Sequence, residues 1–248
     1  SGKLNHFGYN VSTGEYIDYH ATVPFANVWI AEYPFTRDLN FQSDDTGWWT
    51  IFVVKAKNED LEFSYVYEKD GLVKWITTKS NVIPVTDEDN TDIAIQFIDP
   101  YYFNLAMKPI VEEMVEAMTG MPFTFVNAMV VTVGKSWASM HSDLLPHGDP
   151  GATVSSIPLL TYPTIGPIYF NEAVQPDPNY YETSVDGGVT WINVGLGTYD
   201  VTAHKTGVNY ETVRFNMTEA DVENGVVLYI ASPPDSVQGD NDSDPGEW

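Results

Sequence analysis

The sequence contains no cysteine. This absence excludes disulfide bonds, thiolate zinc sites, iron–sulfur clusters, covalently attached haem and cysteine nucleophiles. It also leaves the redox compartment open, because neither a disulfide framework nor a set of free thiols is present to indicate one.

Basic residues are scarce. The 248 residues include 11 Lys and Arg against 35 Asp and Glu, which gives a formal net charge of −24, and arginine stands only at Arg37 and Arg214. Nucleic acids and anionic membrane surfaces are bound through clustered Lys and Arg. The composition therefore argues against both kinds of partner.

Long apolar runs are also absent. No stretch approaches the roughly 18 consecutive apolar residues of a membrane helix, so we expect no membrane span. The first residues, 1–6, lack the apolar region of a signal peptide, so we expect no unprocessed one. Few Lys, many Asp and Asn, and Thr-rich strands favour an extracellular or cell-surface location.

Catalytic signatures are missing as well. The sequence has no Gly-x-Ser-x-Gly elbow, no His-Glu-x-x-His, no phosphate loop and no dinucleotide fingerprint. Carboxylates are abundant, but in so acidic a chain their abundance does not indicate paired catalytic acids. The sequence thus favours a non-catalytic protein.

What the chain does contain is alternation. Leu61, Phe63 and Tyr65 alternate with polar residues, and Tyr199 and Val201 do the same later in the chain. Such a period of two is typical of half-buried strands. Turn signals rich in Gly, Asp, Asn and Pro recur at short intervals between these runs. The pattern predicts a mostly β protein built from antiparallel β-sandwiches.

One segment has helical periodicity instead. Six apolar residues recur at spacings of three and four: Phe103, Met107, Ile110, Val111, Met114 and Met118. Pro109 suits the first helical position and Gly120 a stop. We predict one amphipathic helix whose Met-rich face packs on a sheet, the alternative being a groove for a cofactor or partner.

This helix separates two β-rich halves of similar pattern, which indicates a duplicated module. The predicted boundaries are a first Ig-like module over 1–99, a helical connector over 100–127, a second module over 128–234 and an acidic tail over 235–248.

The second half carries a specific pattern of residues. Pro150-Gly151-Ala152 opens a strand, Asp186-Gly187 forms a turn into another, and Gly197-Thr198-Tyr199 leads to Lys205 and Gly207. Over 128–231 the chain resembles the carboxypeptidase-regulatory-like, CnaB-type and transthyretin-like modules, and over 5–98 it resembles them in outline, without the Gly-Thr-Tyr element.

This resemblance implies a seven-stranded extracellular stalk, adhesin repeat or enzyme appendage without catalytic residues of its own. The isopeptide bond of the CnaB type would need a Lys near an Asn or Asp, together with a catalytic acid.

Metal sites are suggested by three acidic or His-containing segments. His141, Asp143, His147 and Asp149 offer imidazole and carboxylate ligands suited to zinc, iron or copper. The alternative is a turn-rich loop between strands.

Oxygen-rich stretches suggest calcium. The candidate ligands are Asp87, Asp89 and Asp92 in one loop, and Asp240, Asp242 and Asp244 in the tail. In the tail Pro245 replaces the glycine of a calcium loop, so a solvated acidic tail is the alternative. A bound cation would relieve the self-repulsion of the chain.

Aromatic residues are the last candidates. Trp48 and Trp49 must point to opposite faces of a strand, so one can fill the core while the other faces outward. An outward Trp, with tyrosines at 101, 102, 180 and 181, would stack on sugars or anchor a protein partner.

We therefore expect an exported, non-catalytic β-sandwich protein of surface architecture, adhesion or homo-assembly, whose partners are other copies or another surface protein. The alternatives are a metal-binding protein or metal-dependent enzyme centred on His141 and His147, and a carbohydrate-binding module.

Overall fold

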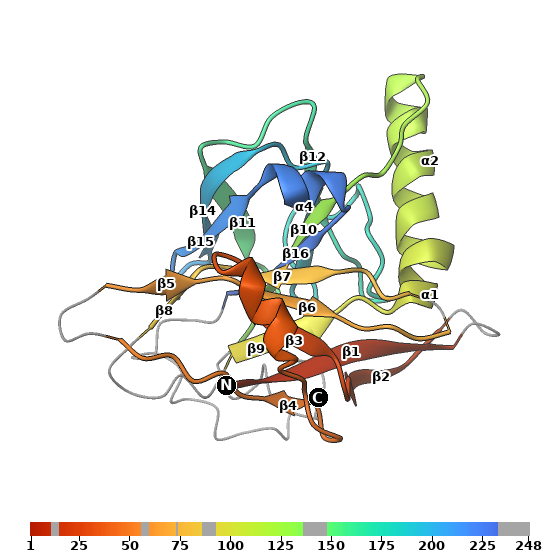
Figure 1. Cartoon of the computed structure of the whole chain (residues 1–248). Coiled ribbons are helices and arrows are strands. Elements are labelled where there is room, and N and C mark those ends of the chain that lie inside the picture. The colour runs from red at the N-terminus through yellow and green to blue at the C-terminus, as the bar shows by residue number, and fades with distance from the viewer. Residues whose placement is uncertain (11–14, 56–59, 73, 86–92, 136–147, 233–248) are drawn as a thin grey trace, which may run out of the picture.

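The computed structural model describes residues 1–10, 15–55, 60–72, 74–85, 93–135 and 148–232 (Figure 1). Its strands are β1 (Gly2–Asn10), β2 (Glu15–Thr22), β3 (Asn27–Ile30), β4 (Trp48–Trp49), β5 (Glu62–Phe63), β6 (Tyr65–Glu68), β7 (Thr78–Ser80), β8 (Ile83–Pro84), β9 (Ile93–Phe97), β10 (Ala128–Val133), β11 (Thr153–Ile157), β12 (Ile165–Tyr169), β13 (Gly188–Ile192), β14 (Gly197–His204), β15 (Val213–Met217) and β16 (Val227–Ser232). The helical segments are η1 (Pro34–Leu39), α1 (Pro100–Tyr102), η2 (Phe103–Met107), α2 (Lys108–Thr119) and α4 (Glu219–Glu223). The predicted class, mostly β with antiparallel sheets and one long helix, is confirmed.

The second half forms a sandwich. Strands β12, β13, β10 and β16 make one face, and the sheet β11-β14-β15 packs on it. Along β14 the side chains of Tyr199, Val201 and Ala203 are buried in the shared core, while Asp200, Thr202 and His204 lie on the other face. The alternation seen in the sequence is therefore the alternation of a strand with one buried face.

Strand β16 joins the two halves of the chain. It lies between β10 and β7 and runs parallel to both, within a seven-stranded sheet ordered β12-β13-β10-β16-β7-β6-β3. Leu228 and Ile230 face the core of the second half, whereas Tyr229 and Ala231 face the core of the first. A strand buried on both faces needs a continuous apolar run, which explains why this segment does not alternate. The predicted modules thus share one sheet.

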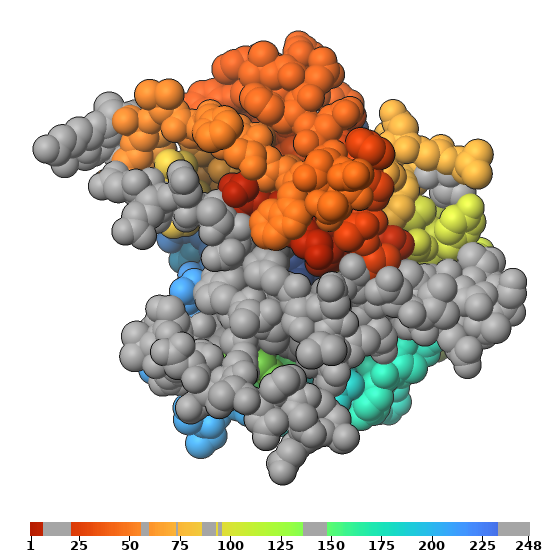
Figure 2. Space-filling view, turned by 90° about the horizontal axis from the view of Figure 1, so that it is seen from below, coloured from red at the N-terminus to blue at the C-terminus, as the bar shows by residue number. Residues whose placement is uncertain are grey.

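The first half closes around its own core. Strand β1 pairs with β2 and β4 in antiparallel fashion and with β9 in parallel, and this sheet packs on β3 and β6. Strands β5 and β8 form a separate short ribbon. In the view from below, the first half (red and orange) lies above and the blue part of the second half lies below (Figure 2).

The helix begins earlier than predicted. Its first residue is Pro100. The Asp99 carboxylate caps the N-terminus of the helix there, because it accepts hydrogen bonds from the N–H groups of Tyr101 and Tyr102. Pro109 therefore lies inside the helical segment. The π-helical turn η2 directly precedes α2, the helix that contains this proline. A proline has no N–H, so it cannot donate the regular hydrogen bond to the preceding helical turn.

The apolar stripe of this helix faces the sheet. Phe103, Met107 and Val111 are buried against β10, β12 and β13, whereas Met118 is 71% exposed. Gly120, with a φ of 70°, ends the helix as predicted. The core-facing interpretation therefore holds for most of the stripe. Within the described residues, no helix combines the length and apolarity that a membrane crossing requires.

Candidate functional site

The predicted metal ligand Asp149 lies at the centre of a buried polar cluster. One carboxylate oxygen contacts the Lys205 amine, and the other accepts a hydrogen bond of 2.5 Å from the Tyr210 hydroxyl. Burial raises the pKa of Tyr210, and the hydrogen bond and negative charge of Asp149 raise it further. Tyr210 therefore stays protonated and serves as a donor. We call these three residues the Asp149 cluster.

The backbone around Asp149 is fixed by Thr183. The Thr183 hydroxyl donates to the Asp149 carbonyl (2.6 Å) and accepts from the Ala152 N–H (2.9 Å). Gly148 is required just before it, because a Cβ there would lie 2.2 Å from the Gly187 nitrogen. These contacts hold the carboxylate at the start of β11, where the end of β14 and the loop before β15 bring its partners.

The other members of that predicted metal set, His141, Asp143 and His147, lie outside the described residues. In the part of the chain that the structure describes, no group of three His, Asp or Glu side chains could hold a metal ion. Both oxygens of Asp149 have donors, so a metal there would have to displace Lys205 or Tyr210.

The calcium candidates Asp87, Asp89, Asp92, Asp240, Asp242 and Asp244 also lie outside the described residues. They stay predictions.

The Asp149 cluster contains two of the three groups that an isopeptide bond needs, an amine and a carboxyl group in contact. The other side chain bonded to this carboxyl is the phenol of Tyr210, not a carboxylic acid. As described, the cluster is an ion pair supported by a hydrogen bond.

A polar hollow of about 780 Å³ opens beside Lys205. Six polar residues of its lining are Thr153, Thr202, His204, Lys205, Thr206 and Asn209. Among the described residues that line it, none is an Asp or Glu, although the whole chain holds 35 of them. No local sequence pattern indicates this hollow, because its walls come from β11, β14 and the loop that follows β14.

A second buried carboxyl lies at the end of β10. Burial raises the pKa of Asp186 to about 7, although the Gly188 N–H donates to it and opposes the shift. Among the described residues, its Oδ1 has no hydrogen-bond partner, and the same holds for the hydroxyls of Ser184 and Ser232. Backbone contacts bring these three residues together. The Val133 N–H donates to the Gly187 carbonyl, the Gly187 N–H donates to the Ser184 carbonyl, and Val133 pairs with Ser232 across the sheet. The sequence indicated Asp186 only as a turn residue.

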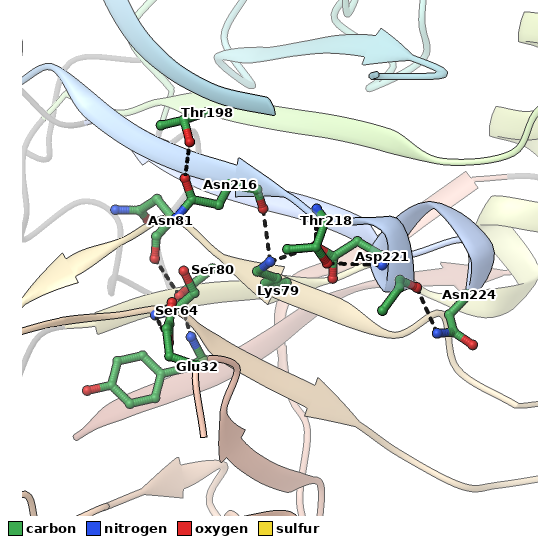
Figure 3. A network of polar contacts seen from close by, with 12 residues as sticks. Glu32, Ser64, Lys79, Ser80, Asn81, Thr198, Asn216, Thr218, Asp221 and Asn224 are labelled. Atoms are coloured by element: carbon green, nitrogen blue, oxygen red, sulfur yellow. Dashed lines mark hydrogen bonds and ion pairs between the residues drawn. The ribbon is translucent and has the colours of Figure 1, made fainter. Parts of the chain in front are cut away.

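A polar network connects the two halves near β16 (Figure 3). Lys79 of β7 is 2% exposed, and its amine donates to Asp221 (2.7 Å) and to the Asn216 carbonyl (2.9 Å). Asp221 also accepts from the N–H and hydroxyl of Thr218, which caps α4. A buried cation of the first half is thus bound by residues of the second.

The aromatic prediction is confirmed for the Trp pair. Trp48 is 41% exposed, whereas Trp49 is 3% exposed and packs on Tyr65 and Tyr67 in the first core. The four tyrosines divide as well. Tyr102 is buried, Tyr180 is half-buried, and Tyr101 and Tyr181 are exposed. The exposed rings belong to different loops and helices rather than to one strand face.

Comparison with known proteins assigns no family to this chain. No family model and no curated protein matches the chain. Among solved structures, the Bacillus anthracis TIE protein is similar with a TM-score of 0.26 and 12% identity, over 95% of this chain and 34% of that one. The chain therefore spans about a third of the length of that protein.

Proposed function

We propose that this chain is an exported, non-catalytic β-sandwich protein of surface architecture, adhesion or homo-assembly. Its second half is, in this proposal, a module of the carboxypeptidase-regulatory-like and CnaB type. The observation that carries the proposal is the contact of Lys79 with Asp221 and Asn216, which ties the two halves together inside the molecule.

Such a contact suits a structural role. Removing a charge from water is costly, and a buried ion pair is retained where it fixes one arrangement of the elements that hold it. Lys79 and Asp221 lie 142 positions apart in the sequence, so their pairing fixes the first half against the second. The Asp149 cluster does the same within the second half, joining β11 to the end of β14. In the proposal, both contacts connect elements of the fold that lie far apart in the sequence.

Exposed apolar side chains support assembly. Ile157, the last residue of β11, and Leu159 and Tyr162, which follow it in the sequence, are each more than 70% exposed. Exposed apolar groups of this size that cluster on a polar surface often mark contacts with other proteins. In the proposal they contact a second copy of the chain.

Light scattering tests the assembly part. The full chain should show a mass that rises with concentration, and Leu159→Glu should lower that mass. Leu72→Glu, a matched control at another exposed leucine, should leave it unchanged. A full chain that stays monomeric at high micromolar concentration would exclude homo-assembly and leave architecture and adhesion as the proposed roles.

A further inference from the structure

We propose that the polar hollow beside Lys205 binds a sugar that carries a carboxylate, such as a uronic acid unit. This goes beyond the proposed function, because the hollow is separate from the contacts that hold the two halves together. Its test does not depend on whether the chain assembles.

The charge of the hollow differs from that of the chain. The net charge is −24, which repels anions from most of the surface. Among the described residues that line the hollow, the charged side chain is that of Lys205, with His204 beside it. Asp149 lies behind the amine, since its side chain is 10% exposed against 30% for Lys205. A ligand in the hollow therefore meets the ammonium group before the carboxylate.

The polar groups are held in place before a ligand arrives. Thr202 and His204 share one face of β14 because they are two positions apart, and Thr153 pairs with His204 across the strands. The His204 Nε2 lies 2.7 Å from the Ser155 hydroxyl, and the Thr202 and Thr212 hydroxyls lie 2.8 Å apart. Side chains fixed in this way lose little freedom on binding.

The chemistry of the hollow favours a sugar over a simple anion. The hollow, of about 780 Å³, is open to solvent over most of its extent, so a ligand would lie against its polar wall rather than be enclosed. The Thr hydroxyls both donate and accept, as the hydroxyl groups of a sugar ring require. The Lys205 amine supplies a charged donor for a carboxylate.

The experiment compares two ligands that differ at the carboxyl group, which is ionised in one and a neutral methyl ester in the other. Isothermal titration of the full chain with an oligogalacturonide should show binding, and the methyl ester of the same oligosaccharide should bind at least about tenfold more weakly because it lacks the charge-assisted contact. Lys205→Gln should abolish this preference. Lys74→Gln, at an exposed lysine elsewhere, should retain it.

A second variant covers the case in which Lys205→Gln fails to fold because Asp149 loses its cation. Thr202→Val keeps the shape of a half-exposed side chain and removes one hydroxyl, and it should weaken binding of acid and ester alike. The proposal is overturned if neither ligand binds at millimolar concentration, if both bind equally, or if Lys74→Gln has the effect expected of Lys205→Gln.

Discussion

The carboxyl group of Asp186 shows how burial alone shifts a titration at the scale of one residue. It is 4% exposed, one of its oxygens has no hydrogen-bond partner in the described part of the chain, and its pKa rises from 3.8 to about 7. The folded state therefore holds the proton more tightly than the unfolded chain does. This contribution to stability is fully present below about pH 4 and is lost as the pH rises through about 7. Carboxylates whose pKa is lowered, such as Asp44 and Asp200, have the opposite effect on stability. Their contribution is present above their ordinary pKa of 3.8 and is lost as the pH falls below it.

Substitution of Asp186 by asparagine should remove this pH dependence. Asp186→Asn carries no ionisable group, so the variant should gain on the order of 1–3 kcal/mol over the wild type at pH 8, where the wild type must bury a charge. At pH 4 the two should be close in stability. Urea unfolding of both proteins at several pH values measures the difference. An equal slope between pH 4 and 7 in both would show that Asp186 is not the group responsible.

Tyr210 is the second residue whose role can be isolated. Tyr210→Phe removes the hydroxyl that donates to Asp149 and leaves a buried carboxylate oxygen without that donor, so the free energy of unfolding should fall by about 1–3 kcal/mol. Tyr181→Phe, at a tyrosine 79% exposed, is the matched control and should change it by less than about 0.5 kcal/mol. Equal effects of the two changes would mean that the Tyr210 hydroxyl contributes nothing specific.

At the scale of elements, local pattern identified the strands and helix but not their neighbours. The alternation of β14 and the opposite faces of Trp48 and Trp49 follow from the period of two. The apolar face of the helix likewise follows from the spacing of three and four residues. The helix begins at Pro100 rather than at Pro109, because both prolines fit a first helical position and the Asp99 cap selects the earlier one. The position of β16 between β10 and β7 depends on pairing between distant segments, which a local period does not contain.

The ion pair between β7 and α4 gives a prediction at this scale. Lys79→Met leaves Asp221 buried without its cation and should lower the free energy of unfolding by about 3–5 kcal/mol. The double variant Lys79→Met with Asp221→Asn removes both charges and should recover a large part of that loss. Arg214→Met breaks the exposed pair with Asp200 and should cost no more than about 1 kcal/mol.

Thermal unfolding followed by circular dichroism, together with urea titration, distinguishes these variants. If Lys79→Met and Arg214→Met cost the same, the buried pair does not hold the halves together. If the double variant is no more stable than Lys79→Met, the loss comes from packing rather than from an unpaired charge.

At the scale of the whole molecule, the candidate site was the part that sequence could predict least. The sequence suggests Asp149 as a metal ligand, yet its partners Lys205 and Tyr210 lie 56 and 61 positions away. The family pattern includes Lys205, and no sequence pattern indicates Tyr210. The polar hollow could not be predicted for the same reason, because three separate segments of the chain form its walls. Composition, by contrast, acts over the entire chain. The excess of acidic residues argues against nucleic acid partners, and the absence of cysteine excludes thiol chemistry, without any knowledge of the fold.

The central claim, an exported protein that acts at the cell surface, is tested most directly by adding protease to intact cells that produce the chain and following it by immunoblot. The account predicts that the chain is cut in intact cells, while a cytoplasmic marker in the same sample is preserved. Protection of the chain until the cells are lysed would contradict it.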